Sequence, residues 1–342
     1  MIWSGNKTLV LSRYGFVKDD IGKYRNVQSA SNVVKEPAER FRETNASILR
    51  IIHLSDLQGA SFGENNIELL NRISDARPHL IVFSGDLVDR RMNVDKDFKA
   101  VIDFMKNLRG IAPTFFSYGN HELAFLESTV DCLREKLENS GIVALDGTSH
   151  IEEVVLDGTS HIEEEVLDGT SHVEDAEIHT LSDHEMRNIS DLDDYKPRSR
   201  KIKVLLTGFR EKLLMVKGKN RTKKNSDVNL GAVRSVIEDI KQKRSESQCD
   251  MSILLAHEPQ FIEEYAAANY DFIFSGHAHG GQIRLPLLGG LFSPGQGVFP
   301  KFTSGVHCAG EGKMIISRGL GNSSFPIRIF NRPEIVLAEI CI

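Results

Sequence analysis

The chain of 342 residues is 40% hydrophobic, which is enough apolar material for one elaborate domain or two ordinary ones. No window approaches the roughly 20 apolar residues of a membrane span, and the amino terminus lacks a basic segment followed by an apolar one, so we expect a cytoplasmic protein. The four cysteines lie far apart and form no C-x-x-C pair, which argues against a zinc ribbon or a disulfide framework.

The net charge of -6 is unevenly distributed along the chain. Residues 145–194 contain sixteen Asp and Glu against the single basic residue Arg187, so most of the negative charge belongs to this insert. A basic cluster follows at 210–224. No aromatic residue interleaves this cluster for stacking on bases, so a solvated loop is favoured over a phosphate-rich partner, and we expect no nucleic-acid partner.

The first residues differ from the rest of the chain in their patterning. Residues 7–14 alternate enough to form an edge strand, whereas 17–47 is polar and weakly patterned and is expected to wrap the surface. We therefore divide the chain into an N-terminal segment, 1–47, and a main domain, 48–342, which is interrupted by the acidic insert at 145–194.

The main domain begins with a repeated unit, in which a buried strand ends in a polar loop. Strands are predicted at 48–54, 79–83 and 113–118, and amphipathic helices at 65–75 and 98–108. The loops after the strands are Ser55-Asp56-Leu57-Gln58-Gly59, Ser84-Gly85-Asp86-Leu87-Val88-Asp89 and Gly119-Asn120-His121-Glu122. Ligands of an α/β sheet bind beyond the carboxyl ends of its strands, so function is expected in these loops.

The acidic insert contains an eleven-residue tandem repeat, whose three copies start at Leu145, Leu156 and Leu167. The short copies offer few apolar positions for a stacked core, so we favour an expanded hairpin or mobile loop over a binding module. A histidine with acidic neighbours recurs in each copy, which leaves weak metal scavenging open: His150, His161 and His172.

The second half of the chain continues the pattern of strands and loops. Strands are predicted at 142–145, 202–207, 251–256, 271–274, 314–317 and 335–340, and helices at 128–139, 229–243 and 260–268. One of these strands delivers His257. Another runs into Gly276-His277-Ala278-His279-Gly280, where the glycines force an abrupt turn and both imidazoles leave the carboxyl end of the strand, placed to hold a metal.

Together the loops offer carboxylate, amide and imidazole groups in the mixture that a site for two metal ions requires. Two divalent ions about 3.5–4 Å apart need a bridging carboxylate, and Asp86 is the natural bridge. The alternative is that these residues merely cap strands and helices. Five such loops, each after a buried strand, favour the metal site, whose candidate residues are Asp56, Asp86, Asn120, His121, His257, His277 and His279.

The ordered blocks Asp56-Leu57-Gln58, Gly85-Asp86-Leu87-Val88-Asp89, Gly119-Asn120-His121-Glu122, His257 and Gly276-His277-Ala278-His279 resemble the pattern of the calcineurin-like metallophosphoesterases. The resemblance spans roughly 51–340, and the stretches 276–281, 285–290 and 317–322 are similar to a bacterial branch whose members often sit at a membrane surface. It implies an α/β fold, a four-layer α/β/β/α sandwich of two mixed sheets with helices outside.

The resemblance also implies roles for the loop residues. One metal ion would take Asp56, Asp86 and His279, and the other would take Asp86, Asn120, His257 and His277. His121 would lie over the phosphate, stabilising charge or protonating the leaving oxygen, while a hydroxide between the two metals attacks phosphorus in line. Glu122 and Asp89 would orient these groups.

This chain departs from the family pattern at one position, because Gln58 stands where the family places a histidine. An amide oxygen binds divalent transition metals less strongly than an imidazole, so the first ion, of the set Mn, Fe, Zn or Mg, should be held loosely or be a harder ion such as manganese or magnesium. The sequence leaves three arrangements for this ion. Gln58 binds it through its amide oxygen, a water molecule takes the place of Gln58 as ligand, or the site works with one firmly held ion. A degenerate member that binds phosphate or metal without hydrolysis is the alternative function.

The substrate is expected to be a phosphomonoester or phosphodiester. Residues 285–302 are rich in leucine and phenylalanine among glycines and prolines. They would either dip into a membrane interface and favour a lipid-linked phosphate, with peripheral membrane contact, or pack under their own loop beside a site for a phosphorylated small molecule.

Overall fold

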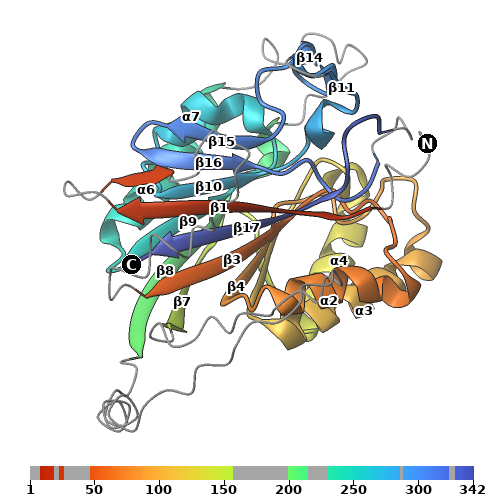
Figure 1. The fold of residues 1–342 in the computed structure, drawn as a ribbon, viewed down its shortest axis with the longest axis horizontal. Coiled ribbons are helices and arrows are strands. Elements are labelled where there is room, and N and C mark those ends of the chain that lie inside the picture. Colours follow the sequence, from red (N-terminus) through yellow and green to blue (C-terminus); the bar gives the residue numbers. More distant parts are fainter. Residues whose placement is uncertain are drawn as a thin grey trace, which may run out of the picture.

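The computed structural model describes residues 8–18, 23–26, 47–156, 199–214, 230–285, 288–322 and 328–342. Two mixed β-sheets pack face to face, and helices cover both outer faces (Figure 1). This arrangement confirms the predicted four-layer α/β/β/α sandwich. The helices on the first sheet are α2 (Ile67–Asp75), α3 (Val94–Ile111) and α4 (Glu127–Asn139), and those on the second are α6 (Leu230–Glu246) and α7 (Ile262–Ala266).

The first sheet has seven strands in the order β2 (Tyr24–Asn26), β1 (Val10–Lys18), β17 (Glu334–Cys341), β3 (Ile48–Leu54), β4 (Leu80–Phe83), β5 (Thr114–Ser117) and β6 (Val143–Leu145). Strands β3 to β6 are parallel, as their connecting helices require. The predicted edge strand at 7–14 corresponds to β1, but the edge position is wrong, because β1 lies between β17 and the short β2. Residues 27–46, part of the predicted surface wrap, lie outside the described residues.

The second sheet has six strands in the order β15 (Gly305–Ala309), β16 (Gly312–Ile316), β10 (Phe272–Ser275), β9 (Met251–Leu255), β8 (Arg200–Gly208) and β7 (Ser149–Leu156). The first copy of the tandem repeat forms β7, which pairs antiparallel with β8. This pairing fits the expanded hairpin that the sequence predicted. The connecting residues 157–198, including His161 and His172, lie outside the described residues.

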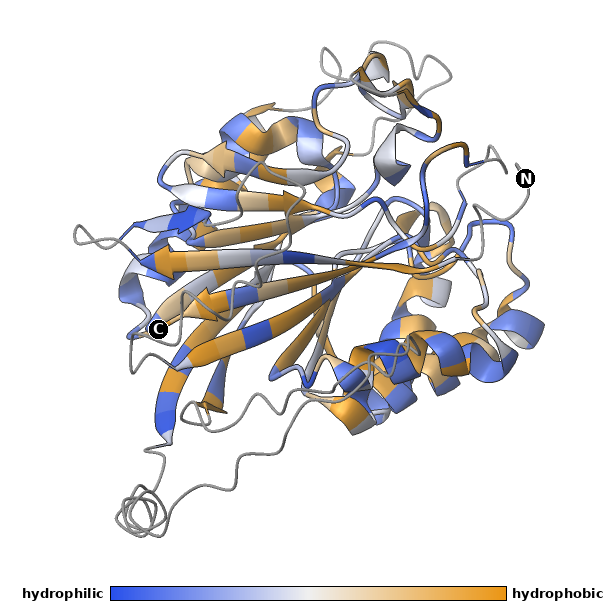
Figure 2. Cartoon of the chain, in the orientation of Figure 1, coloured by the Kyte–Doolittle hydropathy of each residue, from blue (hydrophilic) through white to orange (hydrophobic). Residues whose placement is uncertain are grey.

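The apolar residues form three layers between the sheets and helices. Aromatic rings from both sheets meet in the middle layer, where Phe16 and Phe272 lie 5.0 Å apart between ring centroids. Helix α3 buries Phe98, Val101 and Met105, the face that its spacing predicted. Figure 2 shows apolar colour along the central strands and polar residues on the outward faces of the helices. No described helix is long and apolar enough to cross a membrane.

Several short elements follow strand ends and help to shape the loops there. The 3-10 helices are Glu64–Asn66, Glu122–Ala124, Glu211–Leu214, Pro259–Phe261 and His279–Gly281. Two small hairpins lie between β10 and β15 in the chain, namely β11 (Arg284–Leu285) with β12 (Gly289–Gly290), and β13 (Phe292–Ser293) with β14 (Gly297–Val298). The loops after β3, β4, β5, β9 and β10 meet where the two sheets come together, so the predicted ligands gather from both sheets.

Candidate metal centre

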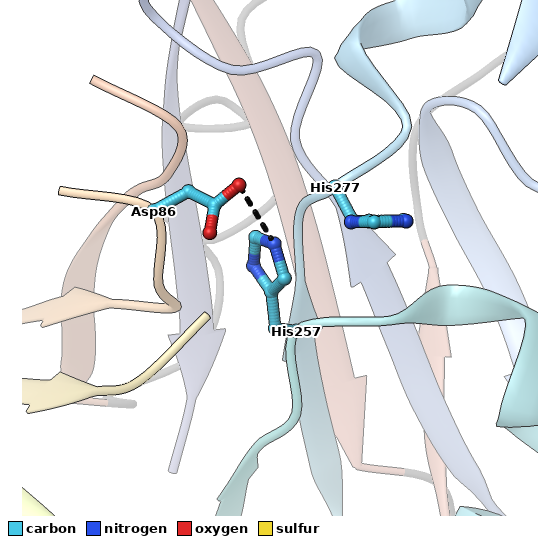
Figure 3. Close-up of side chains that lie close together, drawn as sticks. All are labelled: Asp86, His257 and His277. Carbon is cyan, nitrogen blue, oxygen red and sulfur yellow. Dashed lines mark ion pairs between the residues drawn. The ribbon is translucent and has the colours of Figure 1, made fainter. Parts of the chain in front are cut away.

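Two groups of buried side chains have the composition of metal sites. Asp86, His257 and His277 form one group, and Asp56, Asp86 and His279 form the other. Within each group, one ligand atom per residue lies within 4.8 Å of the others. Asp86 belongs to both groups, which is the position of a bridging carboxylate in a site for two ions. Figure 3 shows the Asp86 carboxylate facing the imidazole of His257, with the ring of His277 beside them.

The imidazole nitrogens lie close to the carboxylate oxygens within each group. His257 Nε2 lies 3.3 Å from Asp86 Oδ2, and His279 Nε2 lies 3.4 Å from Asp56 Oδ1. The two groups also touch, since His257 Nε2 is 4.0 Å from Asp56 Oδ1. All four residues are buried. Carboxylates and imidazoles at such separations, shielded from bulk water, are the donors that divalent transition metals prefer.

Several candidate ligand residues have a strained backbone conformation. Asp56, Gln58, Asp86, His277 and His279 have positive φ angles of 52°, 47°, 56°, 64° and 46°. Residues other than glycine adopt this region rarely and at a cost, and they cluster at functional sites. Each of these residues lies in the loop that follows β3, β4 or β10. The sequence motifs indicated abrupt turns at the glycines, but they did not indicate that the ligands themselves are strained.

Hydrogen bonds hold the carboxylates in place. Asp56 accepts hydrogen bonds from the backbone N–H of His277 at 3.0 and 3.1 Å and from Ser55 Oγ at 2.7 Å. Asp86 Oδ1 accepts one from the N–H of His121 at 2.8 Å. These donors orient the carboxylates and leave oxygens on the side of the imidazoles, so both aspartates are set in place by backbone from other loops.

The two imidazoles nearest the carboxylates are oriented through their other ring nitrogen. His257 Nδ1 lies 2.7 Å from the carbonyl oxygen of Ser84, and His279 Nδ1 lies 3.2 Å from that of Gly321. A carbonyl accepts but cannot donate, so Nδ1 carries the proton in both rings. Nε2 is then the nitrogen that faces the carboxylates and could bind a metal ion.

Gln58 lies between the ligands of the second group. Its Nε2 donates a hydrogen bond to Asp86 Oδ2 at 2.9 Å and lies 3.3 Å from His279 Nε2. Its Oε1 is buried and has no hydrogen-bond partner among the described residues. A half-turn of the amide would exchange the two atoms and place the oxygen beside Asp86 and His279. The side chain therefore fits the role of a weak oxygen ligand.

Asn120 is placed by neighbours that both contact Asp86. The N–H of His121 bonds Asp86 Oδ1, and a Cβ atom at Gly119 would lie 2.3 Å from the same oxygen. The Oδ1 atom of Asn120 is buried without a hydrogen-bond partner among the described residues. Orphaned buried oxygens are costly, and a cation at this position would satisfy them. The donor set therefore fits two divalent metal ions.

His121 belongs to neither metal group in the described structure. Its Nε2 lies 3.9 Å from Asp86 Oδ2, its Nδ1 lies 3.8 Å from Asp89 Oδ2, and it accepts a hydrogen bond from the N–H of Arg90 at 3.3 Å. The side chain retains 9% of its exposure. It therefore borders the ligands on a side that solvent still reaches.

Glu122 ties two of the ligand loops together. Its fully buried carboxylate accepts hydrogen bonds from the backbone N–H groups of Asp86, Val88 and Gly119 at 2.9, 2.9 and 2.7 Å. Burial and the charge of Asp86 raise the pKa of Glu122 to about 7. The residue positions the loops after β4 and β5 without facing the ligands itself.

The buried charges act strongly on one another. Burial would raise the pKa of Asp86, but the charge and hydrogen bond of His257 outweigh it and hold the pKa well below the usual range. Burial would likewise lower the pKa of His257, and Asp86 instead raises it well above the usual range. In the metal-free chain a proton on His257 thus neutralises Asp86. A divalent cation would displace that proton, because metal ligands bind in their deprotonated form.

Two supporting residues were missed by the sequence analysis. Arg328 is 3% exposed and donates hydrogen bonds to the carbonyl oxygens of Gly321 and Arg318, with Nη2 3.5 Å from His279 Nδ1. Asn331 donates from Nδ2 to the carbonyl of His279 at 2.7 Å. Both follow the last motif by about fifty residues, and no spacing rule in the sequence linked them to it.

Comparisons with known proteins agree with the resemblance seen in the motifs. The chain is 24% identical over 295 residues to the uncharacterized metallophosphoesterase YkoQ of Bacillus subtilis, covering 85% of this chain and 83% of that protein. It is also 24% identical over 307 residues to the phosphodiesterase YaeI of Escherichia coli, covering 88% of this chain and 85% of that protein. Among solved structures, TT1561 of Thermus thermophilus matches with a TM-score of 0.43 and 9% identity, covering 80% of this chain and 91% of that one.

A family model of the calcineurin-like phosphoesterases matches residues 49–281. This match contains all five motif blocks and more than half of the chain. The chain therefore belongs to the calcineurin-like phosphoesterase family.

Proposed function

We propose that this protein is a metal-dependent phosphoesterase that hydrolyses phosphomonoesters or phosphodiesters at a centre for two divalent ions. The sharing of Asp86 between the two groups of ligands carries the proposal. Asp56, Asp86, His279 and Gln58 would hold one ion. The other ion would take Asp86 together with Asn120, His257 and His277.

Bound divalent ions would supply an activated water molecule and positive charge opposite the phosphate oxygens. The chain's own groups would do the rest. His121, which borders the ligands without joining them, would donate a hydrogen bond or a proton to the leaving oxygen. Asp89, 3.8 Å from His121 Nδ1 and itself held by Arg91, would help to orient that ring. Asn120 would serve both as a ligand and as a fixed polar group beside the phosphate.

A test of the proposal combines metal analysis of the purified protein with assays on aryl phosphomonoesters and diesters. Asp86→Ala and Asn120→Ala should lose most of the hydrolysis and bind less metal. Lys313→Ala, at the far end of β16, serves as the control. Hydrolysis by Asp86→Ala at the parent rate would contradict the proposal.

A second candidate function is a degenerate member that binds phosphate or metal without hydrolysis. The observation that favours it is Gln58, whose amide nitrogen, an atom that cannot bind a metal ion, faces Asp86. Metal analysis separates the two functions: one firmly bound ion and no hydrolysis of either ester would favour the binding module. Two bound ions with hydrolysis would favour the enzyme.

For the substrate, we propose a lipid-linked phosphate reached by peripheral contact with a membrane through residues 285–302. The supporting observation is a set of exposed apolar side chains on the two small hairpins, with Leu288 66%, Val298 64% and Phe299 59% exposed. The hairpins are joined to the ligand loop, since the N–H of Leu291 bonds the carbonyl of Gly281 at 3.2 Å. Apolar side chains flanking an active site can insert between lipid headgroups.

Liposome flotation of the parent and of the Phe292→Ser, Phe299→Ser double variant tests this substrate class. The parent should be recovered with the vesicles in the floating fraction, and the variant should stay in the dense bottom fraction without lipid. Equal recovery of both proteins with lipid would remove the membrane argument. A phosphorylated small molecule would then be the better substrate class.

A further inference from the structure

We propose that Arg284 and Arg318 form a second anion-binding subsite beside the metal centre, and that the substrate carries a second phosphate group in addition to the one that is hydrolysed. This inference rests on the proposed phosphoesterase function. It adds a specificity-determining site that lies outside the five motif blocks of the metal ligands.

Both arginines are anchored next to metal ligands. Arg284 Nη1 donates a hydrogen bond at 3.0 Å to the carbonyl oxygen of Gly280, the residue after His279. Arg318 directly precedes Gly319, where a Cβ atom would lie 2.7 Å from Asp56 Cβ. The two side chains therefore start at the edge of the group formed by Asp56, Asp86 and His279.

The two arginines also lie near each other. Arg284 donates its backbone N–H to Ile329, and Arg318 accepts at its carbonyl from Nη1 of Arg328 at 2.9 Å, so both border the segment 328–329. After burial, the positive charge of Arg318 is the largest influence that lowers the pKa of Arg284. The positive charges of Arg284 and Arg318 thus act against each other, and an anion bound beside both would relieve the repulsion.

The local charges leave a surplus of positive charge. Arg318 Nη2 pairs with Glu334 Oε1 at 3.0 Å, and Oε2 of Glu334 accepts the N–H of Arg318 at 2.8 Å. Glu334 is thus occupied by Arg318 and by Ser12, which donates to the same carboxylate. No ion pair joins Arg284 to an acidic residue among the described parts of the chain. Glu334 is therefore the acidic group that acts on both Arg284 and Arg318, and its single charge faces two guanidinium groups.

The arginines differ in how a ligand could reach them. Arg328 is 3% exposed and directs its guanidinium to the backbone carbonyls of Gly321 and Arg318, which makes it a positioning residue. Arg318 keeps 18% of its side-chain exposure, and Arg284 is likewise partly exposed. A planar guanidinium with donors left for a ligand binds phosphate oxygens in pairs, so a second phosphate is the chemistry that fits.

The test compares propylphosphonate with propane bisphosphonate, which carries a phosphonate at each end and is not hydrolysed. Protein loaded with manganese and dialysed free of excess metal is titrated with each compound at one ionic strength, because salt screens such contacts. The parent should bind the bisphosphonate at least about tenfold more tightly than the monophosphonate, a difference of about 1.4 kcal/mol. Arg284→Gln and Arg318→Gln should reduce that ratio to about one and leave binding of the monophosphonate unchanged.

Controls separate binding from folding. Arg234→Gln, an exposed arginine on α6, should keep the parent ratio. Since Arg318→Gln leaves Glu334 without its partner, the double variant Arg318→Gln, Glu334→Gln should also lose the ratio while unfolding at the parent temperature. Arg318→Lys should retain part of it.

Three results would overturn the inference: equal affinities of the two compounds in the parent, no detectable binding of the bisphosphonate, or equal loss of both compounds in the variants. A fourth is loss of flotation with phosphatidic acid vesicles while the ratio is unchanged, which would assign the arginines to lipid headgroups. If the ratio behaves as expected but no ester is hydrolysed, the subsite stands and the proposed enzymatic function fails.

Discussion

Replacement of Gly119 by alanine should disrupt the metal centre although it replaces none of the proposed metal ligands. A Cβ atom at Gly119 would lie 2.3 Å from Asp86 Oδ1 and 2.5 Å from Asp86 N, whereas ordinary contacts are 3.4–4 Å. The carboxylate or its loop must therefore move by about 1 Å, a shift that the packed surroundings resist. This movement would pull Asp86 away from the N–H of His121 and from Glu122, which bond its side chain and backbone.

The cost of this clash should appear in two measurements. Overpacking of a close-packed site typically costs about 1–3 kcal/mol, which urea unfolding in EDTA would detect. Misplacing the shared ligand should weaken manganese binding by about 10–100-fold, as disturbances around metal ligands do, and titration of the metal-free protein would show it. Hydrolysis of an aryl phosphate should fall with metal occupancy.

Gly110→Ala is the matched control, because a Cβ at Gly110 meets no atom within 4 Å and the residue lies inside α3. This variant should be more stable than the parent by about 0.5–1 kcal/mol, with unchanged metal binding. If Gly119→Ala binds manganese as tightly as Gly110→Ala does, Asp86 is not the shared ligand that its position indicates.

Three further predictions follow from the site and its surroundings. Gln58→His should tighten the weaker manganese site by at least about tenfold in a calorimetric titration, because an imidazole replaces an amide; unchanged affinity would mean that residue 58 is not a ligand. Manganese at about a hundred times its dissociation constant should raise the unfolding free energy of the parent by about 2.7 kcal/mol, and that of Asp86→Asn by far less; equal gains would place the metal elsewhere. Burial lowers the pKa of His53 to about 3 from 6.5, so the stability that depends on the neutral ring is present above pH 6.5 and is lost as pH falls toward 3. Between pH 7.5 and 4.5, His53→Leu should therefore lose roughly 2–3 kcal/mol less unfolding free energy than the parent in urea titrations, and parallel losses would contradict the buried neutral ring.

The periodicity of the sequence predicted most elements because their causes are local. The apolar run of β3 and the spacing of Phe98, Val101 and Met105 in α3 repeat at the intervals of a strand and a helix. The bounds of strand β7 were not predicted, since Ser-His-Ile-Glu-Glu-Val-Val-Leu does not alternate strictly, and it becomes a strand through pairing with β8. Strand β1 was placed at the edge, because no local signal tells where a strand lies in its sheet.

The candidate site divides in the same way. Spacing after each strand was enough to name Asp56, Asp86 and the paired histidines, since the turn that follows a buried strand is local. Spacing could not predict the orientation of Gln58, because Asp86, 28 residues later, and His279, 221 residues later, orient the amide. The link between Arg328 and His279 likewise depends on distant loops, because the Gly321 carbonyl accepts hydrogen bonds from both side chains.

The sequence by itself determined which residues could bind metal and that they follow buried strands, because turn residues and donor chemistry are properties of short segments. Only the tertiary structure decided how Gln58 faces Asp86 and His279, and that Arg284 and Arg318 border the ligand loops. The physical reason is that both facts depend on how the two sheets pack. That packing is set by the apolar layer between them, and no segment of the chain contains it alone.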